Sequence, residues 1–213
     1  MKYLSTAAVG IFLAASAANA AVIDFESFSA GDVVSGAQGF TVDGVGFEIS
    51  VSSNGNNDIA MIFDTNNPTG GDGDLAAPFN DGLGGTLSPG NVLIISEDGD
   101  SSDPDDEGKG GIITFTFDSA VKLSGFDAFD DVSLTVTASD GSSTSVNVAA
   151  DNQFASLSTA FTGITSVSFD FGKQSGAIDN LQVSAVPLPA PALMLLAGMG
   201  GLGWAARRRK AAN

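Results

Sequence analysis

The sequence predicts an all-β protein, folded as an antiparallel β-sandwich of jelly-roll type. Apolar residues alternate with Ser, Thr or Asp along 113–117, 134–137 and 166–171, which is typical of strands with one buried and one wet face. Gly-rich segments separate such runs, and no window of ten or more residues shows the period of a helix. About nine to eleven short strands of this kind close naturally as two packed sheets.

The expected strands occupy the middle of the chain. We place them near 22–26, 45–52, 58–63, 92–96, 113–117, 121–127, 132–138, 143–149, 166–171 and 177–184. Asp140-Gly141 has the composition of a tight hairpin turn between two of these strands. Two stretches, 64–91 and 97–111, interrupt the strand rhythm, and loops of that length are usually functional or mobile.

The first twenty residues have the three parts of a secretory signal peptide. Lys2 precedes an apolar run, Ala7 to Ala15, and the segment closes with the small-residue site Ala18-Asn19-Ala20. We therefore expect a signal-peptide helix over 1–20, cleaved between Ala20 and Ala21. A buried N-terminal helix is the alternative.

The C-terminal segment predicts a transmembrane helix. Val186 to Ala206 carries no charge over 21 residues, and at about 1.5 Å per residue such a helix just crosses a hydrocarbon core of about 30 Å. The basic cluster Arg207 to Lys210 would remain on the cytoplasmic side. A hydrophobic core helix is the alternative, but this segment has no polar face.

The same segment resembles the VPLPA variant of the PEP-CTERM sorting signal: a short motif, an apolar span and an Arg cluster, in that order. The matching positions are Val186, Pro187, Leu188, Pro189, Ala190, Arg207, Arg208 and Arg209. The resemblance implies that a membrane protease of the exosortase type recognises the motif and removes the anchor. It also implies a precursor held transiently in the inner membrane, then release to the cell surface or an extracellular polysaccharide matrix. The resemblance covers 186–213 and leaves 21–185 as the working domain.

The composition of that domain excludes several kinds of chemistry. The chain contains no His and no Cys, so an imidazole base, a thiol nucleophile, a disulfide and a zinc–thiolate site are all absent. Residues 21–185 hold all 25 acids and three Lys, a net charge of −22, which opposes binding to nucleic acid. Phe is the only aromatic residue in the domain.

Carboxylates are the remaining chemistry, and they favour Ca²⁺, which takes six to eight oxygen ligands. The first candidate group follows the expected strand 58–63 and consists of Asp64, Asn66, Asp72 and Asp74. Flanking Gly residues would let the backbone wrap round an ion. The spacing is not that of an EF-hand, and a solvated turn is the alternative.

The second candidate group joins the two ends of the domain. Asp24 and Glu26 share one face of the expected first strand, while Asp179 and Asn180 lie in the expected last strand. These two segments resemble the calcium-stapled jelly rolls of carbohydrate-binding modules, and the resemblance implies Glu26 and Asp179 as ligands. The alternative is an acidic wet face of an edge strand.

A third candidate is the acid run 97–107, which places seven acids in eleven residues. Such a run more often forms a solvated loop than a site, although it could hold a loose extracellular calcium ion. Asp127, Asp130 and Asp131 form a similar, weaker group.

Together these features predict a non-enzymatic, exported surface or matrix protein, with a structural or adhesive sandwich stabilised by calcium. A carbohydrate-binding module for a specific glycan, engaging extracellular polysaccharide, is the alternative. A glycoside hydrolase is the third reading, and it would need two carboxylates in a sugar cleft. The absence of Trp and Tyr from the domain disfavours such a cleft.

Overall fold

The structure is a computed structural model, and it describes residues 20–186. Asn19–Val186 forms a compact unit of its own. The predicted signal-peptide and transmembrane helices lie outside the described residues. Within residues 20–186, no helix has the length and apolarity needed to cross a membrane.

Twelve strands and one short 3-10 turn account for the regular structure of the described residues. The strands are β1 Ala20–Ile23, β2 Gly39–Val42, β3 Val45–Ser53, β4 Ala60–Asp64, β5 Phe79–Asn80, β6 Thr86–Leu87, β7 Asn91–Ile95, β8 Gly111–Phe129, β9 Ser133–Ala138, β10 Ser143–Asn147, β11 Phe154–Asp170 and β12 Ala177–Ala185. The 3-10 turn, η1, spans Gly73–Leu75. The all-β prediction is therefore confirmed for this part of the chain.

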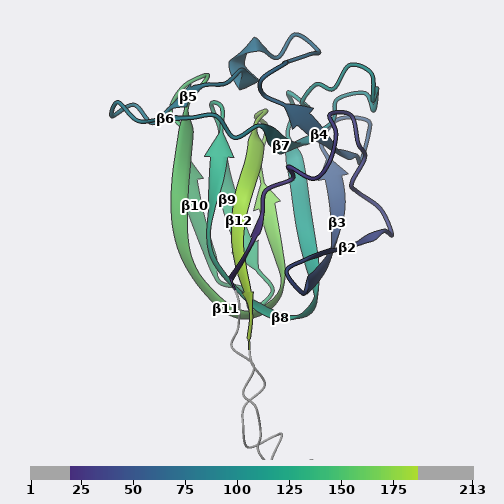
Figure 1. Ribbon diagram of the computed structural model, residues 1–213, viewed down its shortest axis with the longest axis vertical. Helices are drawn as coiled ribbons and strands as arrows, with labels where there is room; N and C mark the ends of the chain where they lie inside the picture. The colour runs from purple at the N-terminus through teal and green to yellow at the C-terminus, as the bar shows by residue number, and fades with distance from the viewer. Residues whose placement is uncertain (1–19, 187–213) are drawn as a thin grey trace, which may run out of the picture. The chain divides into compact units, whose positions relative to one another are not determined.

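Two long strands, β8 and β11, carry the chain from one layer of the molecule to the other (Figure 1). The C-terminal half of β8 pairs with the N-terminal half of β11, in the layer that also contains β12, β7, β4 and β1. Their other halves pair in the layer that contains β3, β2, β9 and β10. Three register shifts lie between Ser158 and Ser166, where β11 passes from one layer to the other, and the ten strands remain hydrogen-bonded in one continuous sheet. All these pairings are antiparallel.

Most expected strands are present, with some differences in extent. The expected strands 113–117 and 121–127 are one continuous strand, β8, and 166–171 is the end of the longer β11. The hairpin at Asp140-Gly141 joins β9 and β10 as predicted. β2, β5, β6 and the first half of β11 were not predicted.

The main core lies between the two layers and uses the apolar side of each alternating strand. In β9, Leu134, Val136 and Ala138 are buried while the intervening Ser and Thr residues are exposed. Phe169 packs edge-on against Phe115 and Phe126, with ring centroids 5.8 and 5.1 Å apart. The alternation of polar and apolar residues in the sequence thus determines which side of each strand faces the core.

A second, outer core explains why β4 and β7 have no polar alternation. Met61, Phe63, Val92 and Ile94 point away from the main core, and the 64–91 stretch covers them. That stretch contributes the buried Leu75 and Phe79, among other apolar side chains. The long loop predicted from its Gly and Asp content is therefore a packed cover over one sheet.

The beginning and end of the domain are neighbours. β1 pairs with the second half of β12, and Ala20 lies opposite Ser184. The expected first strand is shorter than predicted: β1 ends at Ile23, and Phe25 adopts a left-handed φ of 55° that turns the chain. Placing Asp24 and Glu26 within the strand was therefore wrong, because both lie in the turn that follows it, although Ile23 and Phe25 are buried as expected.

Candidate functional site

The fold gathers carboxylates at two places. We call the first the strand cluster, consisting of Asp24, Glu26, Asp127 and Asp179. Asp179 in β12 lies directly opposite Asp127 in β8, and the turn after β1 brings the other two carboxylates within electrostatic range. Like charges opposite each other on paired strands are destabilising, so this arrangement calls for a compensating partner.

Asp179 is the most unusual member of the strand cluster. Only 1% of the residue is exposed, and its Oδ1 atom has no hydrogen-bond partner. Burial raises the pKa of Asp179 to about 9; a backbone hydrogen bond from Asn180 opposes this effect, and the negative charges of Asp127, Asp24 and Glu26 add to it. Without a cation, Asp179 is therefore a neutral acid at pH 7.

The other acids of the strand cluster are held by fixed donors. Asn180 follows Asp179 at an irregularity in β12, has a left-handed φ of 54°, and donates from Nδ2 to Asp127 Oδ2 at 2.8 Å. The Ser156 hydroxyl donates to the other oxygen of Asp127. The backbone N–H of Asn91 donates to Glu26 Oε1 at 2.7 Å. These contacts use both oxygens of Asp127 and one oxygen of Glu26.

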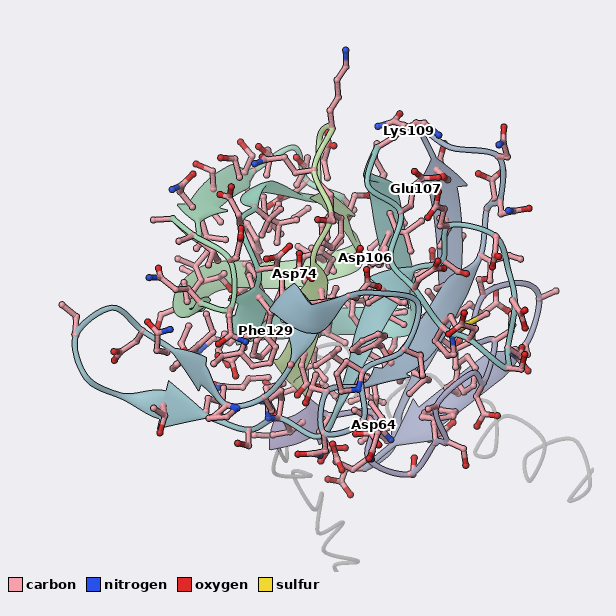
Figure 2. All side chains as sticks on the ribbon, turned by 90° about the horizontal axis from the view of Figure 1, so that it is seen from above. Asp64, Asp74, Asp106, Glu107, Lys109 and Phe129 are labelled. Carbon is pink, nitrogen blue, oxygen red and sulfur yellow. The ribbon has the colours of Figure 1, made fainter. Side chains whose placement is uncertain are left out.

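We call the second group the loop cluster, consisting of Asp72, Asp74, Asp106 and Asp130. Figure 2 shows Asp74 and Asp106 near each other in the view from above, and their charges interact. The Asp106 N–H donates to Asp72 Oδ2 at 2.8 Å, and the Gly176 N–H donates to Asp106 Oδ2 at 2.7 Å. The cluster thus joins the 64–91 stretch, the acid run and the end of β8.

Burial perturbs three of these four acids. It raises the pKa of Asp106 to about 8, and the nearby charge of Asp72 adds to the effect. Burial also raises the pKa of Asp72 to about 6, although the Asp106 N–H opposes it. Asp130 is 2% exposed, and burial raises its pKa above the ordinary value. The Ser175 hydroxyl donates to Asp130 Oδ2 at 3.1 Å, but Asp130 Oδ1 has no partner.

Hydrogen bonds also join the 64–91 stretch to the acid run beside the loop cluster. The Thr69 hydroxyl donates to the Pro104 carbonyl at 2.7 Å, and the Gly70 N–H donates to Asp103 Oδ1 at 2.8 Å. Gly70 has a left-handed φ of 64°, and a Cβ there would lie 2.1 Å from Asp105 Cβ. Glycine is therefore required for this close approach.

Asp64 does not share the environment of the loop cluster. Its Oδ1 accepts the Asn66 N–H at 2.9 Å, and its Oδ2 accepts Asn67 Nδ2 at 2.7 Å. Burial raises the pKa of Asp64, but these hydrogen bonds outweigh it and bring the pKa below its ordinary value. The structure thus uses Asp64 to shape its own turn.

The acid run 97–107 ends in an ion pair between a buried glutamate, Glu107, and a largely exposed lysine, Lys109. Glu107 is 3% exposed, and its Oε1 lies 3.8 Å from Lys109 Nζ; this is the one salt bridge among residues 20–186. The Lys109 N–H also donates to Glu107 Oε1 at 2.9 Å. The last residue of the acid run is therefore buried and held by contacts with Lys109, and does not belong to a fully solvated loop.

The structure regroups the residues that the sequence singled out. Asp179 is brought within electrostatic range of Asp24 and Glu26, as expected for the terminal strands. Asp127 joins the strand cluster and Asp130 the loop cluster, whereas Asp131 is exposed. As the structure stands, no three acidic side chains within residues 20–186 are close enough together to hold a metal ion.

A separate pocket of about 420 Å³ lies between the β9–β10 turn and β11. Six hydroxyl side chains line it, together with Asp140 and Phe161. Asp140 uses Oδ1 to accept the Ser142 N–H at 2.9 Å and also the Ser142 hydroxyl. The pocket offers hydrogen bonds and has no cationic side chain in its lining, and its one aromatic residue, Phe161, is buried in the main core.

The processing sites predicted from the sequence lie at or beyond the ends of the described residues. Ala20 and Ala21 are in β1, and Ala21 is buried. Val186 donates its N–H to the Ala120 carbonyl at 3.0 Å. The rest of the sorting motif and the Arg cluster are outside the described residues. No protein-family model and no curated protein matches this chain.

Proposed function

We propose that this protein is a non-enzymatic, exported surface or extracellular-matrix protein whose β-sandwich, of jelly-roll type, is stabilised by calcium. A signal-peptide helix exports the chain, and a transmembrane helix anchors the precursor in the inner membrane. An exosortase-type protease then cleaves near Val186–Ala190, and the domain reaches the cell surface or the polysaccharide matrix. The sequence motifs described above support this route.

One observation supports the calcium part of the proposal: the burial of Asp179 among Asp24, Glu26 and Asp127. A carboxylate buried without a partner costs free energy, and the cost is relieved either by a proton or by a cation. Calcium accepts carboxylate, carbonyl and water oxygens in flexible geometry and at extracellular concentrations. It would fix the turn after β1 to β12 and so fasten the two ends of the domain.

Thermal unfolding of the compact domain, residues 19–186, tests this role. Calcium at about 100 times its dissociation constant adds about 2.7 kcal/mol, and we expect the melting temperature to rise by roughly 5–10 °C relative to chelator. Asp179→Asn should abolish most of that rise, whereas Glu48→Gln, at an exposed position on β3, should retain it. Equal melting temperatures with calcium and chelator would contradict the calcium part.

Processing is tested separately by the intact mass of the surface protein. We expect a mass that begins at Ala21 and excludes everything beyond about residue 190. A mature protein that retains Trp204 would show that the sorting proposal is wrong.

A carbohydrate-binding module is the second candidate, and the hydroxyl-lined pocket beside β11 is the observation that favours it. Sugars bind largely through hydrogen bonds, which the six hydroxyl side chains of the pocket supply; its one aromatic residue, Phe161, is buried in the main core. A glycan array with calcium present discriminates the two proposals. Binding to one class of sugar, lost in Asp140→Ala, would favour the module over a purely structural role.

A further inference from the structure

Three buried side-chain atoms within residues 20–186 lack a hydrogen-bond partner, and all three are Asp carboxylate oxygens. They belong to Asp105, Asp130 and Asp179. Buried polar atoms in native proteins are almost always satisfied, so each of these oxygens needs a proton, an ion or a water molecule as its partner. Two of the three lie in the region where the 64–91 stretch meets the acid run, outside the strand cluster.

Asp130 is the acid of that region whose position the backbone fixes. It follows Phe129 at the end of β8, and its backbone N–H is bonded to the Gln153 carbonyl, which fixes its position. Its Oδ2 accepts the Ser175 hydroxyl, whereas its Oδ1 is buried and has no partner. The negative charges of Asp74 and Asp151 act on Asp130, and the charge of Asp130 acts in turn on Asp106.

Asp106 contacts the same short segment, Ser175-Gly176, that also contacts Asp130. The Gly176 N–H, next in sequence to Ser175, donates to Asp106 Oδ2, so adjacent residues hold one oxygen of each acid. One oxygen of Asp72 is likewise used by the Asp106 N–H. Each of these three acids thus has one oxygen held by a donor, and the second oxygen has no hydrogen bond within the described residues.

We propose that the loop cluster binds a second divalent cation, of the calcium class, through Asp106 and Asp130, with Asp72 and Asp74 completing the oxygen set. Both Asp72 and Asp74 were predicted as ligands together with Asp64, and the structure replaces Asp64 with two acids from other segments. No three carboxylates are yet within coordination distance of a common point. The cation therefore draws the 64–91 stretch and the acid run closer together, and water fills the remaining positions.

This inference deepens the proposed calcium-stabilised function and rests on it. The test is calorimetric titration of residues 19–186 with calcium chloride, which gives the number of ions bound. We expect two ions for the wild type and one for Asp130→Asn, with circular dichroism confirming the fold. Asp106→Asn should give the same loss and replaces Asp130→Asn if that variant does not fold.

Asp131→Asn is the matched control, because Asp131 is adjacent in sequence but exposed. It should still bind two ions. An unchanged ion count in both Asp130→Asn and Asp106→Asn would overturn the inference, as would an equal loss in Asp131→Asn. Asp179→Asn separates the two sites: loss of one ion there, with none lost in Asp130→Asn, leaves the proposed function standing and removes only the second site.

Discussion

The strand cluster and the loop cluster bury the same kind of group in two different frameworks. Asp179 and Asp127 are carried by paired strands whose ladder hydrogen bonds fix the distance between them. Asp72 and Asp106 come from loops that are joined by a few hydrogen bonds. An ionised carboxylate in the strand cluster can reach water only if the sheet unfolds, whereas an ionised carboxylate in the loop cluster can reach water through local opening of the loops. The same chemistry should therefore affect global stability in one place and local order in the other.

The largest expected effect comes from removing the support beneath the loop cluster. Phe79 is fully buried and packs on Phe129 with ring centroids 4.8 Å apart, next to Asp130. We expect Phe79→Ala to cost about 3–5 kcal/mol in urea unfolding, because it leaves a cavity in the outer core. It should also lower calcium affinity at the loop cluster more than at the strand cluster.

Leu83 provides the control for that substitution. It lies between β5 and β6, close to Phe79 in sequence, but is 92% exposed. Leu83→Ala should change stability by less than about 0.5 kcal/mol. If the two substitutions had equal effects, the 64–91 stretch would not be a packed cover.

The next effect is a pH dependence set by the strand cluster in chelator. Asp179 has a pKa of about 9 in the folded protein against an ordinary value of 3.8, so between these pH values the folded state holds a proton that the unfolded state has lost. The free energy of unfolding should therefore fall as the pH rises through this window, by about 1.4 kcal/mol per pH unit.

Asp179→Asn should flatten this slope by about one proton, measured by urea unfolding from pH 5 to pH 8. The loop cluster should contribute less, because local opening lets Asp106 ionise. A stability that increases from pH 5 to pH 8 in chelator would contradict the burial of Asp179 as a neutral acid.

The smallest effect concerns the contact between the two loops. Gly70 and Gly71 both have left-handed φ angles, so Ala at either position costs roughly 1–2 kcal/mol. A Cβ at Gly70 would also collide with Asp105, whereas a Cβ at Gly71 has no neighbour within 4 Å. Gly70→Ala should therefore cost about 1–3 kcal/mol more than Gly71→Ala. Equal melting temperatures would mean that the loops are not held in contact there.

Much of the fold could be predicted because it depends on local patterns. β9 and the end of β11 alternate strictly, since one side faces the main core and the other faces water. The first half of β11 alternates in burial, but it places Thr159 at a partly buried position and Ala160 at an exposed one, and β2 is only four residues long. Neither gives a periodic signal that one sequence can reveal.

The candidate site was predictable only where it depends on the terminal strands. The resemblance to calcium-stapled jelly rolls implied Asp179 and Glu26 as ligands that join the terminal strands, and β1 does lie beside β12. The contact of Asp72 with Asp106 has no such signal, because it spans 34 residues between two irregular loops. It depends on hydrogen bonds between the loops and on the outer core, where the buried Leu75 and Phe79 hold the 64–91 stretch against the sheet.

The position of β12 has a mechanical consequence. β12 is hydrogen-bonded to β8 along one edge and to β7 and β1 along the other, and the chain continues from it directly into Val186. The long loops lie at the opposite end of the domain from Val186 (Figure 1). Tension applied to the chain at Val186 would run along β12. It would load two hydrogen-bond ladders in shear at once, so they would have to break together.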